Sequence, residues 1–393
     1  MPIINSIAAM QEEMTEWRRD IHMHPELGFE EVRTSDLVAE KLQEWGIEVH
    51  RGIAKTGLVG VLKGRDGAAS GRAVGLRADM DALPMDEEND FPHKSTHPGK
   101  FHGCGHDGHT TMLLGAAKYL AETRNFDGTV NFIFQPAEEG RGGGKLMVEE
   151  KLFDRFPCDE VYGLHNWPEL PAGEIAAVPG PIMAAADRFD IAIRARGGHA
   201  AMPHHANDPV VIAAQLVTAF QTLVSRRTDP LDSSVISVTQ VHVGSADNVI
   251  AEEAALSGTV RTFKPETQDM IEGGMARICK GVGEAFGAEI EMNYDRGYPA
   301  TVNHPEHAAL AADIAGSVVG PDKVRRDVEP VMGAEDFSFM LLERPGAYLW
   351  LGQAGGPSGC MVHNPRYDFN DNVLPVGASL FATLVETRLK QAG

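Results

Sequence analysis

The sequence predicts an α/β protein with a second, smaller α+β domain inserted into it. Apolar runs that end abruptly in charged residues alternate with helical stretches, which is typical of a mixed sheet flanked by helices. Between residues 187 and 297 the expected order of elements becomes β-α-β-β-α-β, the ferredoxin-like plan. In addition, 393 residues exceed what one ordinary core accommodates. We therefore expect a discontinuous larger domain, residues 1–186 and 298–393, and an inserted domain, residues 187–297.

The composition narrows the range of partners. A formal net charge of −21 leaves no excess of basic residues for a nucleic-acid-binding face. The four cysteines are scattered without paired spacing, so no disulfide scaffold is expected. The first residues do not have the pattern of a signal peptide, and we expect no membrane-spanning run. These features predict a soluble, cytoplasmic protein that acts on a small molecule and binds neither nucleic acid nor membranes.

Three apolar strands of the larger domain should deliver polar residues to one edge of its sheet. The expected elements, in order, are a helix from residue 4 to near His24, before Pro25, a helix at 33–45, strands at 56–64 and 72–84, a helix at 106–123, a strand from 128 that ends in Glu138 and Glu139, and a strand at 159–168. The strand at 72–84 is apolar and then presents Asp79 and Asp81, and the last strand carries His165 at its C-terminal end. Buried strands of α/β sheets end in this way at functional edges.

A metal site is indicated by the segment FHGCGHDGHT, residues 101–110. Its glycines allow a tight turn on which the side chains of Cys104 and His106 can converge. Thiolate and imidazole together suit zinc, nickel, cobalt or iron better than magnesium or calcium. Three further candidate ligands follow along the chain, Glu139, His165 and His363, which makes enough for two metal ions.

The paired glutamates divide between two expected roles. An isolated Glu-Glu-Gly segment is usually a solvated acidic loop, but this one follows a fully apolar strand and accompanies other ligands. One carboxylate is expected to bind metal, and the other is expected to take the proton of a water molecule. His102, Asp107 and His109 remain further candidates for metal contact.

Motifs along nearly the whole chain resemble one family. They are HMHPELGFEE (22–31), LRADMDALP (76–84), HGCGHDGHT (102–110), QPAEEG (135–140), LHNWP (164–168), GGHAAMPH (197–204), DNVIAEEA (247–254), GTVRTF (258–263), GAEDFS (333–338) and VHNPRYDFND (362–371). The chain is similar to the aminoacylase and carboxypeptidase-G type of two-metal peptidases, in the amidohydrolase branch. That branch includes hippurate hydrolase, N-acyl-L-amino acid amidohydrolase and indole-3-acetyl-amino-acid hydrolase, and the resemblance implies a zinc-exopeptidase-like catalytic domain.

The resemblance implies a role for each motif residue. The expected metal ligands are Cys104 as the bridge, His106, Glu139, His165 and His363, holding two divalent ions (Zn, Mn, Co or Ni). Glu138 resembles the general base, and Asp79 resembles an orienter of a ligating histidine rather than a ligand. In the inserted domain, which would serve as lid and dimerisation domain, His199 resembles a histidine that steadies the oxyanion of the partner's site in a homodimer. Asn248 and Arg261 resemble residues that grip the substrate's carboxylate.

The implied reaction is hydrolysis of an N-acyl amino acid, with an acetyl, benzoyl or similar acyl group, by a metal-bound hydroxide. Two alternatives remain open. Cys104 could instead be the nucleophile of a thiol amidase. The chain could also be a non-catalytic metal- or ligand-binding relative, although none of the expected catalytic residues is missing.

Overall fold

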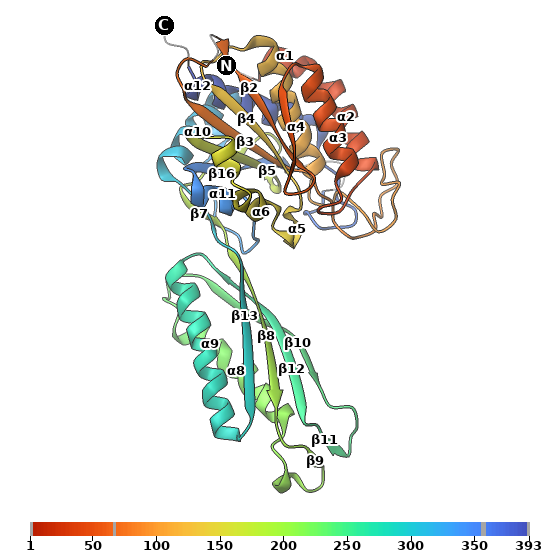
Figure 1. The fold of residues 1–393 in the computed structure, drawn as a ribbon, viewed down its shortest axis with the longest axis vertical. Coiled ribbons are helices and arrows are strands. Elements are labelled where there is room, and N and C mark those ends of the chain that lie inside the picture. Colours follow the sequence, from red (N-terminus) through yellow and green to blue (C-terminus); the bar gives the residue numbers. More distant parts are fainter. Residues whose placement is uncertain (1–2, 66–67, 355–358, 391–393) are drawn as a thin grey trace. The chain divides into compact units, whose positions relative to one another are not determined.

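The computed structural model describes residues 3–65, 68–354 and 359–390 (Figure 1). The chain forms two compact units. The first comprises Met1–Ile182, Val302–Glu329 and Asp336–Gly393, and the second comprises Met183–Thr301 and Pro330–Glu335. The second unit is therefore slightly longer at both ends than the inserted domain expected at residues 187–297, and it includes the short stretch 330–335, which was expected in the larger domain.

An eight-stranded mixed sheet forms the centre of the first unit (Figure 1). Its strands, in spatial order, are β1 (Glu48–Ile53), β2 (Gly57–Lys63), β4 (Thr129–Gln135), β3 (Ala73–Asp79), β5 (Glu160–Pro171), β16 (Gly346–Ala354), β6 (Ile175–Ala176) and β15 (Val324–Arg325). The four central strands β4, β3, β5 and β16 run parallel, whereas β1 and β2 are antiparallel additions. This arrangement confirms the predicted fold class.

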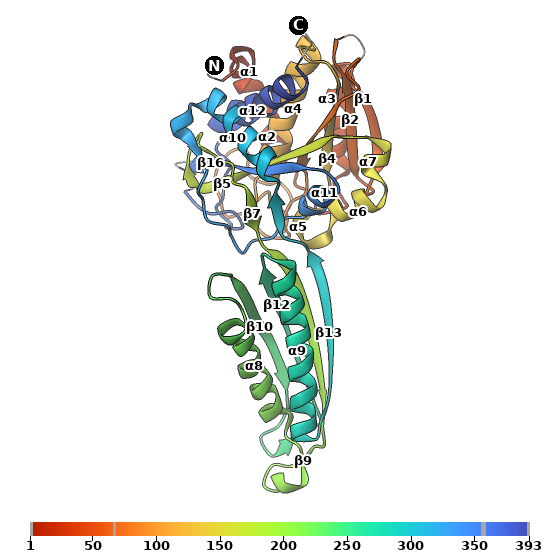
Figure 2. The ribbon, with the colours of Figure 1, turned by 90° about the vertical axis from the view of Figure 1, so that its left-hand side faces the viewer.

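Helices cover this sheet. They are α1 (Asn5–Ala9), α2 (Gln11–Met23), α3 (Val32–Glu44), α4 (His106–Thr123), α5 (Glu138–Arg141), α6 (Gly143–Glu149), α7 (Leu152–Arg155), α10 (Pro305–Val319), α11 (Ser338–Glu343) and α12 (Leu374–Arg388), with short 3-10 helices at Pro321–Lys323 and Asp371–Val373. The main core is built on α4, which packs against both α2 and α12 (Figure 2). Apolar side chains of β2, β3 and β4 complete that core, and α6 packs against α7 and α11. The central strands are therefore buried, as their apolar sequences require.

The N-terminal region differs from expectation in two details. The single helix expected from residue 4 to near His24 is divided into α1 and α2, because Met10 N–H donates to the Ile7 carbonyl in a tighter three-residue bond. Helix α2 still ends at Met23, before Pro25, as expected. Strand β1 was not expected, because its largely polar, only partly buried residues give little apolar signal at this edge of the sheet.

The second unit is an antiparallel four-stranded sheet with two long helices on one side (Figure 1). The sheet order is β10 (Ser234–Val243), β12 (Glu253–Thr262), β8 (Ala185–Arg194) and β13 (Glu289–Tyr298). Helices α8 (Pro209–Arg226) and α9 (Pro265–Phe286) bury their apolar faces against it. The order corresponds to the predicted ferredoxin-like plan. Short strands β9 (Gly198–His199) and β11 (Val249–Ile250) pair with each other, as do β7 (Gly180–Met183) and β14 (Thr301–Asn303), and Pro203–His205 is a 3-10 helix.

Helix α8 differs from one expectation. It is long and apolar enough, by length and composition alone, to cross a membrane, whereas the sequence analysis expected no such run. Its buried residues Ile212, Leu216 and Phe220 recur at helical spacing and pack against the sheet of the second unit. The apolar character of α8 is therefore accounted for in part by this packing.

Candidate metal centre

The parallel strands bring the predicted site residues to one edge of the sheet of the first unit. Asp79 and Gln135 are register partners at the ends of β3 and β4, and the chain continues from Gln135 into the loop that carries Glu138 and Glu139. On the other side of β3, β5 carries His165. The prediction that this strand ends near His165 was wrong in detail. It continues to Pro171 because β16 supplies a pairing partner beyond the end of β3.

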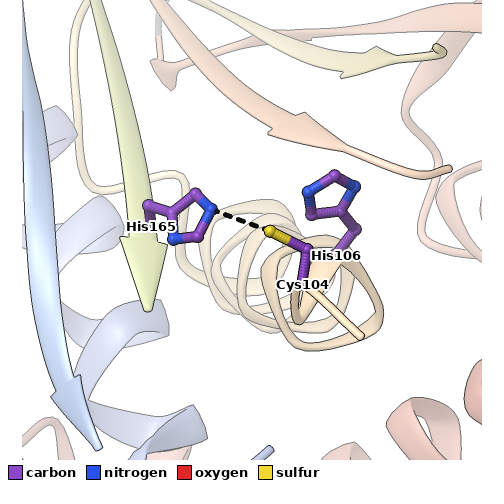
Figure 3. Close-up of side chains that lie close together, drawn as sticks. All are labelled: Cys104, His106 and His165. Carbon is purple, nitrogen blue, oxygen red and sulfur yellow. Dashed lines mark hydrogen bonds between the residues drawn. The ribbon is translucent and has the colours of Figure 1, made fainter. Parts of the chain in front are cut away.

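Cys104 and His106 reach the same edge from the start of α4. Helix α4 begins at His106, directly after Gly105, whose φ of 92° lies in the left-handed region. A Cβ atom on Gly105 would lie only 2.2 Å from Asn166 Oδ1, so a larger residue does not fit. Figure 3 shows the Cys104 sulfur directed at the ring of His165, with His106 nearby.

The structure brings together all five predicted ligands and Glu138. Cys104 Sγ lies 3.5 Å from His165 Nε2, and the ligating atoms of Cys104, His106 and His165 all lie within 4.8 Å of one another. The same 4.8 Å limit holds for two more groups, one of Cys104, Glu139 and His363 and one of His106, Glu138 and Glu139. His363 closes the cluster at its exposed side, with 53% of its side chain accessible and Nε2 3.3 Å from Glu139 Oε1.

The donor atoms of this cluster fit a cation. His165 Nδ1 donates to the Asn166 carbonyl at 2.7 Å, and His106 Nδ1 donates to Asp81 Oδ1 at 3.2 Å. Both rings are thereby oriented through Nδ1, which leaves Nε2 for the cluster. Among the described residues, the buried His106 Nε2 has no hydrogen-bond partner, and the buried Glu139 Oε1 faces His363 Nε2 at 3.3 Å. Buried polar atoms without partners are rare and often mark an ion site.

Burial and close neighbouring groups shift the pKa values of the side chains in the cluster. Hydrogen bonds to Cys104 and Glu139 raise the pKa of His363 to about 10. Burial works against a charge on His106, but the carboxylate of Asp79 raises the pKa of that ring well above its ordinary value. Burial raises the pKa of the Cys104 thiol and lowers the pKa of His165. Because metal ligands must be deprotonated, binding of a cation here is coupled to release of protons.

Asp79 and Asp81 hold different histidines. Asp79 accepts a hydrogen bond from His109 Nδ1 at 2.6 Å and lies 3.8 Å from His106 Nε2. Burial disfavours its charge, but the Arg77 guanidinium at 2.7 Å keeps the pKa of Asp79 well below its usual range. Asp81 orients His106 and also accepts a hydrogen bond from the Glu139 main-chain N–H at 2.9 Å. Asp81 was not among the predicted site residues, although its position two residues beyond Asp79 at the same strand end could have indicated this role.

His102, Asp107 and His109, the further candidates for metal contact, lie in three different environments. His109 Nε2 lies 3.0 Å from Asn166 N and 2.6 Å from its Oδ1, so both ring nitrogens of His109 already have protein neighbours. Asp107 Oδ2 accepts from His22 Nδ1 at 2.7 Å. His102 is 1% exposed, and neither of its ring nitrogens has a hydrogen-bond partner within residues 3–65, 68–354 and 359–390.

Two residues at the cluster have unfavourable backbone conformations. Ala137, directly before Glu138, has φ of 55°, and His363 has φ of 63°. The left-handed region costs a residue with a Cβ atom roughly 1–2 kcal/mol. Such conformations persist where surrounding contacts enforce them, and they concentrate at functional sites.

The remaining predicted residues belong to the second unit. His199 on β9 is exposed, and its Nδ1 accepts from Ala201 N at 3.0 Å. It neighbours Asn248, because β9 pairs with β11 and Ala200 N donates to the Asn248 carbonyl. Arg261 lies near the far end of β12, eight residues or roughly 27 Å from the start of that strand at Glu253. Within one chain, therefore, Arg261 does not lie beside Asn248.

Arg261 has no carboxylate partner in the described part of the chain. Its Nη1 donates to Thr259 Oγ1 and, at 3.2 Å, to the Val260 carbonyl, and neither acceptor carries a charge. Burial lowers the pKa of Arg261, and Asp187 opposes that effect. The guanidinium is thus half-buried without an ion pair, which fits a side chain reserved for an anionic group.

The fold and the donor set define a two-unit metallopeptidase-like protein, and comparison with known proteins gives its family. Residues 75–387 match the model of peptidase family M20/M25/M40, and the chain belongs to this family. The resemblance seen in the motifs is thereby confirmed.

Individual relatives agree with this membership. The chain is 42% identical over 390 residues to the hippurate hydrolase of Campylobacter jejuni, covering 99% of this chain and 100% of that one. It is 46% identical over 292 residues to an N-acyl-L-amino acid amidohydrolase of Geobacillus stearothermophilus, covering 74% of this chain and 78% of that one. The crystal structure of the Bacillus subtilis YXEP protein, described as a dinuclear metal binding peptidase, matches with a TM-score of 0.84 and 32% identity, covering 98% of this chain and 100% of that one.

Proposed function

We propose that this protein is a metal-dependent amidohydrolase that cleaves N-acyl amino acids into a carboxylic acid and a free amino acid. The observation that carries the proposal is the convergence of the five predicted ligands, from four separate segments, around a second carboxylate, that of Glu138. The relatives support the substrate class, because they include a hippurate hydrolase and an N-acyl-L-amino acid amidohydrolase.

We assign two divalent cations to the cluster, held by Cys104, His106, Glu139, His165 and His363. Zinc, manganese, cobalt and nickel all suit a set of one thiolate, three imidazoles and one carboxylate. When bound, such ions supply Lewis acidity toward a carbonyl oxygen and lower the pKa of a coordinated water. Support comes from the buried His106 Nε2, which has no hydrogen-bond partner among the described residues, and from the dinuclear character described for the Bacillus subtilis relative.

Glu138 is the proposed general base. Glu138 is 7% exposed, and its carboxylate lies within 4.8 Å of the ligating atoms of His106 and Glu139, so it is next to the cluster. It would accept the proton of the attacking water and later give that proton to the leaving nitrogen. The same carboxylate thus serves first as base and then as acid.

The second unit would complete the site from another chain. We propose a homodimer, formed through a lid and dimerisation domain at residues 187–297, in which His199 stabilises the oxyanion of the partner's substrate. Asn248 and Arg261 would bind the carboxylate of the amino acid. These roles are supported by the exposed position of His199 and by Arg261, which forms no ion pair with any residue that the structure describes. A cytoplasmic location is proposed as well, since all four cysteines are free thiols.

The alternative of a thiol amidase rests on the 3.5 Å approach of Cys104 Sγ to His165 Nε2. The electrostatic environment argues against it, because burial raises the pKa of the Cys104 thiol whereas nucleophilic cysteines have a lowered pKa. A chelator separates the two mechanisms. Activity that survives exhaustive metal removal would favour the thiol enzyme.

The proposed function is tested with metal-free protein reconstituted separately with zinc, manganese, cobalt or nickel. Each preparation is assayed against N-acetyl, N-benzoyl and N-indoleacetyl amino acids, with release of the free amino acid as the readout. We expect hydrolysis that depends on added metal and on a free carboxylate in the substrate. Absence of hydrolysis with every metal across the panel would refute the proposal.

A further inference from the structure

The loop that carries Glu138 and Glu139 contains few hydrogen bonds of its own to fix its conformation. Between the end of β4 and the start of α6, three residues in the left-handed region, Ala137, Gly140 and Gly142, follow one another within six positions. The backbone hydrogen bond that closes the loop runs from Gly143 N to the Ala137 carbonyl at 2.9 Å. Gly140 and Gly142 adopt this region without strain, but Ala137 does not, and such a conformation persists only where contacts from outside hold it.

One carboxylate, that of Asp336, anchors both ends of this loop. Its Oδ1 accepts from the side-chain amide of Gln135, the last residue of β4, at 2.6 Å. Its Oδ2 accepts from the main-chain N–H of Gly144, just after the loop, at 2.7 Å. The fit at Gly144 is close, because a Cβ atom there would lie 2.9 Å from the Asp336 carbonyl oxygen and 3.0 Å from Oδ1.

Arg77 compensates the charge of this anchor. Its Nη2 donates to Asp336 Oδ1 at 3.1 Å, and its Nε donates to Gln135 Oε1 at 2.8 Å. The third branch, Nη1, reaches Asp79 at 2.7 Å. The side chains of Arg77 and Asp336 are 1% and 0% exposed, so neither charge is stabilised by water. Only a planar guanidinium presents donors in this fork, and lysine could satisfy at most part of it.

We propose that Arg77 and Asp336 are positioning residues that hold the carboxylate of Glu138 in place for proton transfer. Neither is among the five residues assigned to bind metal, and neither is the base. They act by fixing Gln135 and Gly144, the two residues between which the Glu138 loop is suspended. This inference rests on the proposed function, since it concerns the base of that reaction.

The proposal predicts a specific kinetic change in Asp336→Asn. One of the two acceptor oxygens becomes an amide that cannot accept, so one end of the loop is released while volume is conserved. A displacement of the base on the order of 1 Å lowers turnover by about 100-fold. We expect kcat to fall on the order of 10- to 100-fold, with KM within about threefold of the wild-type value and metal content unchanged.

Two more variants keep the test decisive if Asp336→Asn folds poorly. Gly144→Ala introduces a Cβ atom against Asp336 without removing a charge, and Arg77→Lys keeps the charge but not the fork. Both should lower kcat in the same way. The matched control is Glu160→Gln, because Glu160 is another buried carboxylate with an arginine partner, Arg388, but lies at the opposite end of β5. It should lower Tm and leave kcat unchanged.

The outcomes separate the possible failures. Suppose that wild-type protein hydrolyses N-acyl amino acids and that the three variants show a lower Tm with unchanged kcat, as the Glu160→Gln control should. Arg77 and Asp336 would then have a purely structural role, and the proposal would be overturned. Loss of metal in Asp336→Asn would overturn it as well, because Asp336 would then act on the ligands rather than on the base. If wild-type protein is inactive on every substrate, the proposed function fails instead.

Discussion

The two regions that carry candidate functional residues are built in opposite ways. At the metal centre, Cys104, His106 and His165 are buried, and their neighbours fix each ring through a hydrogen bond. On the second unit, His199 is exposed, and its recorded hydrogen bond is to a main-chain N–H two residues away. The first region is thus preorganised within one chain, whereas the role proposed for the second region requires a surface of another chain to meet it.

The largest effect should come from the base itself, at the preorganised centre. Replacing Glu138 with Gln removes the proton acceptor while keeping its size, and should lower kcat on the order of 10²- to 10⁴-fold with metal still bound. Steady-state kinetics and metal analysis by mass spectrometry check this. Glu139→Gln is the adjacent comparison, because loss of a proposed ligand should reduce metal content. A Glu138→Gln variant that retains most of its turnover would show that the base is misassigned.

A somewhat smaller effect is expected at the exposed region. His199→Ala should lower kcat on the order of 10²- to 10³-fold, as removal of one oxyanion donor does, without loss of metal. Because the proposal places His199 in the partner's site, mixing this variant with Glu138→Gln should restore activity in the mixed dimers. Each mixed dimer would contain one site with both an intact Glu138 and an intact His199. No recovery after subunit exchange would argue against a site shared between chains.

The support around the ligands should matter less than the ligands themselves. Asp81→Asn weakens the hydrogen bonds that orient His106 and the Glu139 backbone, and should lower metal affinity or activity about 10- to 100-fold. Competitive titration with a metal-binding dye measures the affinity. Asp90→Asn is the control, since Asp90 is an exposed carboxylate in the next loop. Equal metal affinities for the two variants would show that Asp81 does not support the metal ligands.

The smallest effect is on stability, and it should arise only in the first unit. Burial disfavours a charge on His22, but hydrogen bonds to Asp107 and Glu87 raise its pKa to about 9. A pKa raised on folding gives stabilisation that is complete below the unfolded value of about 6.5 and is lost as the pH rises through 9. The free energy of unfolding should therefore fall by a few kcal/mol between pH 7 and pH 10, as measured by urea denaturation. His22→Gln should flatten this dependence, and an unchanged slope would contradict the assignment.

Sequence alone predicted most of the architecture, because hydrophobic periodicity is a local signal. The continuous apolar runs of β3, β4 and β5, the helix from His106 and the β-α-β-β-α-β order of the inserted unit all follow from the local pattern of apolar residues. The features that escaped detection are those without a local signal. They are the polar edge strand β1, the break at Met10 and the continuation of β5, which depends on a partner strand nearly two hundred residues away.

For the site, the sequence by itself determined which chemical groups are available: one thiol, several imidazoles and a pair of glutamates after an apolar strand. The tertiary structure decided what each group contacts. It gave Asp81 rather than Asp79 the hydrogen bond to His106, and it joined Arg77, Gln135 and Asp336 across more than 250 residues of chain. The physical reason is that residue type sets chemistry locally, whereas hydrogen bonds and ion pairs depend on distances that only the packing of strands and loops establishes.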